Sequence, residues 1–86
     1  MVILIAQQDW REVVELARVL STAGFASETA TDGLTALDKA RTREFALVIL
    51  DMDLTGHDGA GVCSAMRRQG VETPVIFVSS LAATDD

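Results

Sequence analysis

Apolar runs that alternate with helix-like segments constrain this fold more than any other feature of the sequence. Residues 2–6, 45–50 and 75–78 are continuous apolar stretches rich in β-branched side chains, and residues 25–30 form a shorter, alternating stretch. Continuous runs of this kind indicate strands that are covered on both faces. The longer segments between them carry apolar residues at helical spacing. The sequence therefore predicts the element order βαβαβαβ.

The predicted helices begin and end at residues with capping chemistry. Each follows an aspartate, namely Asp9, Asp32 and Asp58. An aspartate at this position accepts hydrogen bonds from the first free backbone N–H groups of a helix. Glu12 stands three residues after Asp9, which is the spacing of a capping box. Gly24 and Gly70 follow the first and third helical segments, where glycine commonly ends a helix.

Polar residues follow the predicted strands at the edge where a site is expected. Strands that alternate with helices predict a parallel sheet with right-handed crossovers, and ligands of such sheets bind at the carboxyl ends of the strands. Gln7 and Gln8 follow the first strand, Asp51 follows the third, and Ser79 follows the fourth. These residues converge if the first and third strands are neighbours. Because an unpaired buried carboxylate is costly, we expect Asp51 at the open rim of the sheet.

Composition limits the classes of function. The 86 residues fit one small domain, and the net charge of −6 argues against nucleic acid or an anionic membrane as a partner reached through bulk charge. The single cysteine, Cys63, cannot form an internal disulfide, which fits a reducing compartment, and it is interpreted as a small core residue on a helix, with a reactive thiol as the alternative. No apolar run approaches the ~20 residues of a membrane span, and the N-terminus lacks signal-peptide features, so we expect a cytoplasmic protein.

Several motifs, in order along the chain, resemble the receiver domain of response regulators. VILDMDLTGHDG at residues 48–59 resembles the third strand of that family and the Asp–Gly that opens its third helix. TPVIFVS at residues 73–79 resembles its fourth strand with a terminal Ser or Thr, and AGF at 23–25 and TDG at 31–33 stand where the family has them. The resemblance covers residues 1–86. It implies a flavodoxin-like, three-layer α/β fold with the strand order 2-1-3-4-5.

The resemblance also implies a part in two-component phosphorelay signalling. Asp51 falls on the phosphoacceptor, which takes a phosphoryl group from a histidine kinase or a phosphotransfer protein, and Ser79 falls on the hydroxyl that hydrogen-bonds this group. Such a transfer normally needs Mg²⁺ and a lysine to neutralise charge. The metal positions of the family fall on Asp51, on the backbone carbonyl of Asp53 and on Gln8. The resemblance implies a signalling module rather than an enzyme.

Two departures from the family pattern predict altered behaviour. Gln7 and Gln8 replace the family's acidic pair, and their neutral oxygens do not attract a dication by charge, so we expect weak Mg²⁺ binding or none. The pattern also ends after the fourth strand, which predicts a partial receiver, the N-terminal two-thirds, without the last helix–strand–helix and its lysine. The fourth strand then becomes an apolar edge, and such an edge pairs readily with another chain. We therefore expect a homodimer, and pairing through residues 74–79 is one route to it.

Two interpretations remain open at this point. Asp51, Ser79 and Asp58 favour a phosphoacceptor switch, whereas the glutamine pair favours a pseudo-receiver that acts as an interaction or dimerisation module without phosphate. An EF-hand beginning at Asp51 is disfavoured because Val62 stands where a glutamate ligand is required. His57 is interpreted as a solvated loop residue, with phosphotransfer through it as the alternative. No nucleophile–base pair or phosphate-binding glycine loop supports an independent enzyme.

Overall fold

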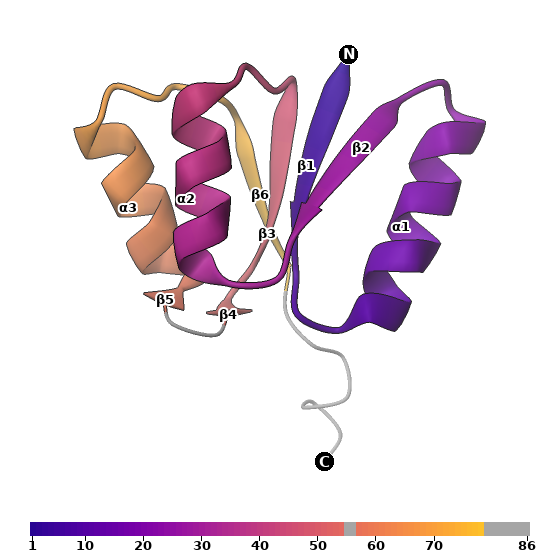
Figure 1. Ribbon diagram of the computed structural model, residues 1–86, viewed down its shortest axis with the longest axis horizontal. Helices are drawn as coiled ribbons and strands as arrows, with labels where there is room; N and C mark the ends of the chain where they lie inside the picture. Colours follow the sequence, from indigo (N-terminus) through magenta and orange to yellow (C-terminus); the bar gives the residue numbers. More distant parts are fainter. Residues whose placement is uncertain (55–56, 79–86) are drawn as a thin grey trace.

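A three-layer arrangement around a parallel sheet organises the chain. The computed structural model describes residues 1–54 and 57–78. Its main sheet has the order β2-β1-β3-β6, with all neighbouring strands parallel. The strands are β1 (Val2–Ala6), β2 (Ala26–Ala30), β3 (Leu47–Asp51) and β6 (Val75–Val78). Figure 1 shows α2 (Gly33–Thr42) and α3 (Gly59–Arg68) on one face and α1 (Trp10–Thr22) on the other. The predicted flavodoxin-like fold is confirmed.

The main core lies between the sheet and the helices α2 and α3. Alternate residues of a strand point to opposite faces. Leu4 of β1 and Leu50 of β3 are fully buried in this core, where they meet side chains of both helices: Ala36, Ala40, Val62 and Met66. Ile3 and Ile5 point to the other face and are also buried, under α1. Burial on both faces explains why β1 and β3 are apolar without a break.

The predicted helix caps are confirmed. Oδ1 of each capping aspartate accepts a backbone hydrogen bond: Asp9 from Arg11 at 3.0 Å, Asp32 from Thr35 at 2.8 Å and Asp58 from Gly61 at 2.7 Å. Gly24 and Gly70 follow α1 and α3 with φ values of 93° and 82°. Residues with a side chain rarely adopt this left-handed conformation, so glycine is what lets the chain leave each helix and turn back to the sheet.

Two parts of the fold differ from the prediction. The third strand spans Leu47–Asp51 rather than residues 45–50, because Phe45 is buried in the core without belonging to a strand, whereas Asp51 pairs with Val78. A short antiparallel ribbon of β4 (Asp53–Leu54) and β5 (His57–Asp58) follows β3 and was not predicted. Two-residue strands carry no periodic signal. Within residues 1–54 and 57–78, no helix is long and apolar enough to cross a membrane.

Candidate functional site

Asp51 is the last residue of β3 and lies at the carboxyl end of the sheet, as predicted. The residue is only 5% exposed, however, which differs from the expectation that its carboxylate is open to solvent. Its Oδ1 accepts a hydrogen bond from the backbone N–H of Asp53 at 3.0 Å, where the chain turns into β4. Met52 donates its backbone N–H to Val78 at 2.9 Å, so the pairing of β3 with β6 continues to this point. The carboxylate is therefore held in place by the turn that follows it.

Gln7 lies beside Asp51 on the neighbouring strand. The last paired residues of β1 and β3 are Ala6 and Leu50, so Gln7 and Asp51 are the next residues on each strand. Their side chains leave the sheet on the same face, because the alternation of neighbouring parallel strands is in step. Gln7 is only 3% exposed, whereas Gln8 is exposed. The sequence predicted that these strand ends converge, and for Gln7 and Asp51 they do.

The side chain of Gln7 is bonded at one end only. Its Nε2 donates to Oε1 of Glu12, a partly buried residue in the first turn of α1. Its own Oε1 is buried and accepts no hydrogen bond from any described residue. The capping-box spacing predicts that Glu12 returns to the backbone of Asp9, but the structure pairs its Oε1 with Gln7 instead. Sequence reasoning missed this contact between β1 and α1.

The ribbon after β3 joins Asp51 to the start of α3. Asp53 lies opposite Asp58 in the β4–β5 pairing, and like charges in that relation are unfavourable. Asp58 is used as the cap of α3, which is its predicted structural role and places its charge at the positive end of the helix. Gly59 follows, and a Cβ atom built there would lie 2.5 Å from the backbone oxygen of Asp51. Only glycine lets the first turn of α3 approach Asp51 this closely.

The rim offers oxygen ligands but little charge for a divalent cation. Mg²⁺ takes oxygen ligands, commonly carboxylates with waters. The Asp51 carboxylate and the unpaired Oε1 of Gln7 are of this type, so the residues present fit the ion in ligand chemistry. Within the described ranges, however, no three His, Cys, Asp or Glu side chains are grouped to hold a metal. An EF-hand loop follows a helix, whereas Asp51 is the end of strand β3, so an EF-hand is excluded here.

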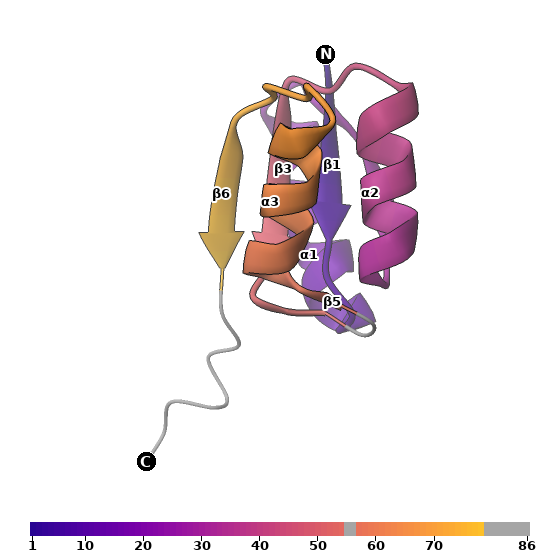
Figure 2. The same cartoon turned by 90° about the vertical axis from the view of Figure 1, so that its left-hand side faces the viewer.

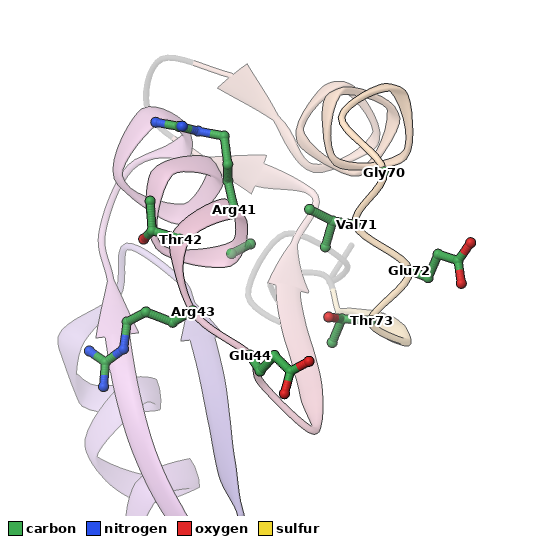
Figure 3. Close-up of a pocket in the computed structure, with 9 residues that line it drawn as sticks. Arg41, Thr42, Arg43, Glu44, Gly70, Val71, Glu72 and Thr73 are labelled. Carbon is green, nitrogen blue, oxygen red and sulfur yellow. The ribbon is translucent and has the colours of Figure 1, made fainter.

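Several predicted positions lie outside this geometry. Ser79, Thr55 and Gly56 are outside the described residues. A hollow of about 300 Å³ lies at the opposite end of the sheet, between the end of α2 and the segment after α3 (Figure 3). Residues 40–44 and 70–73 line it, and none of them is a predicted site residue. The candidate site is thus the rim around Asp51 and not this hollow.

Comparison with known proteins identifies the family. The model of the response regulator receiver domain matches residues 3–86. The chain belongs to the response regulator receiver family. This receiver chain is 42% identical over 84 residues to the transcriptional activator protein IrlR of Burkholderia pseudomallei, covering 98% of the chain and 35% of that protein. It is 34% identical to the transcriptional regulatory protein TcrA of Mycobacterium tuberculosis, covering 98% of the chain and 33% of that protein. The chain thus spans about a third of the length of these curated relatives.

Solved receiver structures share the fold of this receiver chain. The receiver domain of the Francisella response regulator 1452 gives a TM-score of 0.87 at 26% identity, with 96% of this chain and 69% of that chain covered. The response regulator TrrA of Thermotoga maritima, solved in complex with Mg²⁺–BeF, gives 0.86 at 26% identity, with coverages of 95% and 71%. The parallel sheet and its three helices therefore belong to a known receiver architecture.

Proposed function

We propose that this receiver chain is a signalling module of a two-component phosphorelay in which Asp51 accepts the phosphoryl group. The position of Asp51 carries the proposal. β1 leads to α1 on one face of the sheet and β3 leads to α3 on the other, so the strand order reverses between β1 and β3. Parallel α/β sheets bind their ligands at such a point. Asp51 is the carboxylate that this point offers.

The chemistry asks a carboxylate oxygen of Asp51 to attack the phosphorus atom. A P–O bond forms to Asp51 while the bond between phosphorus and the donor breaks, and the donor keeps the bonding electrons. The donor is a histidine kinase, a phosphotransfer protein or a small phosphodonor. Mg²⁺, when bound, would neutralise charge on the phosphoryl oxygens, with Asp51, the Asp53 carbonyl and Gln8 as its proposed ligands. The hydroxyl of Ser79 is proposed to hydrogen-bond the transferred group.

The proposal extends to the domain and its partners. The chain accounts for 69% of the Francisella receiver chain, which supports residues 1–86 as the N-terminal part of a receiver domain. It acts in the cytoplasm as a signalling partner of a kinase and not as an enzyme. No nucleic acid or membrane contact is assigned to residues 1–86, although relatives about three times as long are named transcriptional regulators. A homodimer through residues 74–79 completes the proposal.

Mass spectrometry tests the phosphoacceptor directly. The protein is incubated with a small phosphodonor and Mg²⁺, and its intact mass is recorded. We expect a gain of one phosphoryl group that Asp51→Asn abolishes, because the amide cannot act as the nucleophile. Asp38→Asn is the matched control, since it removes one exposed carboxylate from α2 and should still be modified. No gain in a sample shown to be folded by circular dichroism would contradict the proposal.

The bonding of Gln7 favours a second candidate, a pseudo-receiver that signals without phosphate. The Gln7 amide donates a hydrogen bond to Glu12, and the two glutamines that follow β1 offer no acidic group for Mg²⁺. The double change Gln7→Asp and Gln8→Asp separates the two functions. If only this variant gains a phosphoryl group, the glutamines are the cause of the inactivity and the pseudo-receiver is the function of the natural sequence.

A further inference from the structure

The hydrogen bond between Gln7 and Glu12 fixes which end of the Gln7 amide faces Glu12. A carboxylate can only accept hydrogen bonds, so the NH₂ group must be the end that points to Glu12. The carbonyl oxygen is then turned away from Glu12. This oxygen is buried and has no donor among the described residues. A buried acceptor without a partner is unfavourable, so a donor or a cation that reached this oxygen would be bound favourably.

A second acceptor lies at the same position on the neighbouring strand. The Asp51 side chain leaves the sheet on the same face as that of Gln7, one strand away. Oδ1 of Asp51 already accepts from the Asp53 backbone, whereas Oε1 of Gln7 has no donor among the described residues, so a cation that reached the Gln7 oxygen would also be attracted by the Asp51 carboxylate. The carboxylate of Glu12 adds a second negative charge on the far side of Gln7. A cation at the rim would therefore meet one charged and one neutral oxygen, with another charge close by.

We infer that Glu12 is a positioning residue, which holds the Gln7 amide so that its Oε1 serves with Asp51 as a ligand for a divalent cation. The inferred cation site lies at the same end of the sheet as the proposed phosphoacceptor, and in this respect it rests on the proposed function. Cation binding itself requires no phosphoryl transfer, so the two can be tested separately. The positioning role gives Gln7, rather than only the exposed Gln8, a place among the ligands. It also supplies from α1 part of the negative charge that the end of β1 lacks.

Manganese is a suitable probe, because Mn²⁺ is a paramagnetic ion of oxygen-ligand sites. The ¹⁵N-labelled protein is titrated with Mn²⁺ to millimolar concentration, and the loss of NMR intensity is followed residue by residue. We expect the side-chain amide of Gln7 and the backbone amide of Met52 to broaden first, at concentrations that leave α2 unaffected. Absence of broadening at these two residues would overturn the inference, whether or not Asp51 can be phosphorylated.

Three variants distinguish positioning from a general effect of charge. Glu12→Ala removes the acceptor that holds Gln7, and we expect about tenfold weaker Mn²⁺ binding, the effect of one hydrogen bond to a charged group. Glu12→Gln keeps an acceptor oxygen, so we expect it to lose less affinity for Mn²⁺ than Glu12→Ala. Glu15→Gln, at an exposed site one turn further along α1, removes the same charge and should stay within about twofold of the wild type. Equal losses in all three would assign the effect to charge and overturn the inference.

A double-mutant cycle completes the test. Gln7→Ala deletes the proposed ligand, so Glu12→Ala should have no further effect on Mn²⁺ binding when both changes are present. Additive losses would show that Glu12 acts without Gln7 and would contradict the positioning role. The dispersion of the backbone NMR signals verifies folding in each sample, and the milder Glu12→Gln change takes the place of Glu12→Ala if that variant does not fold.

Discussion

The two outer strands of the described sheet differ in the side chains that lie along their open edges. Glu28 of β2 lies between two cations, with Lys39 Nζ at 3.6 Å from its Oε1 and the guanidinium of Arg43 paired with its Oε2. Lys39 also donates to the backbone oxygen of Thr29 at 2.9 Å. Because Ala30 accepts from Gln7 of β1, and alternate residues of a parallel strand face the same neighbour, the Thr29 carbonyl points to the open edge. A lysine thus occupies an acceptor that another strand would need.

The other outer strand has no such protection within residues 1–54 and 57–78. β6 lies at the margin of the sheet in Figure 2, and among the described strands it pairs only with β3. Ile76 is 52% exposed and Phe77 is 44% exposed, and these neighbours point to opposite faces. No charged side chain stands in Val75–Val78. The contrast teaches that, within the described residues, charged side chains cover the β2 edge, whereas the β6 edge is apolar, a composition that favours pairing with another strand.

The largest expected effect follows from placing a charge on β6. If residues 74–79 form the proposed dimer, Ile76→Lys should weaken self-association roughly 10–100-fold, because burial of an isoleucine contributes about 1.5–3 kcal/mol. Sedimentation equilibrium at several protein concentrations measures this. Val14→Lys is the matched control, since Val14 is an exposed apolar residue on α1 and should not matter. A wild-type chain that remains monomeric throughout would break the comparison.

A smaller effect, on the free energy of unfolding, is expected from removing the carboxylate of Glu28 in β2. Glu28→Ala should lower the free energy of unfolding by about 1 kcal/mol, since it breaks two partly exposed ion pairs and leaves two cations side by side. The loss should shrink in high salt, because added ions screen these charges. Urea unfolding at low and high salt gives both values. Glu15→Ala, which breaks the exposed pair with Arg18, should cost less, and an equal cost would remove any special role of Glu28.

The smallest effect is expected from Lys39→Met. Methionine keeps the apolar stem of lysine but cannot donate to the Thr29 carbonyl, so stability should fall by only about 0.5–1 kcal/mol. Made together with Ile76→Lys, the change should permit weak association through β2, detectable as a concentration-dependent sedimentation coefficient. If this double variant stays as monomeric as Ile76→Lys alone, the lysine is not what protects the edge.

The sequence predicted the framework of the fold better than the details of the site. The run VILIA, the capping aspartates and Gly24 each report a local preference of the chain, and the structure confirms the elements that they mark. The position of Asp51 followed from the same pattern. The Gln7–Glu12 contact did not, because it depends on how α1 is placed against the end of β1. The β4–β5 ribbon was missed because its strands are too short to show a period.

The fit of Gly59 against Asp51 has a consequence for reading mutational data. Any larger residue at position 59 would meet main-chain atoms, with a Cβ atom 2.5 Å from the Asp51 oxygen and 2.9 Å from the Met52 Cα. Main-chain atoms cannot rotate away as a flexible side chain can. In a saturation mutagenesis library, position 59 would therefore score among the positions least tolerant of substitution, although glycine performs no chemistry. Such a score would reflect the close packing of the backbone and not a catalytic role.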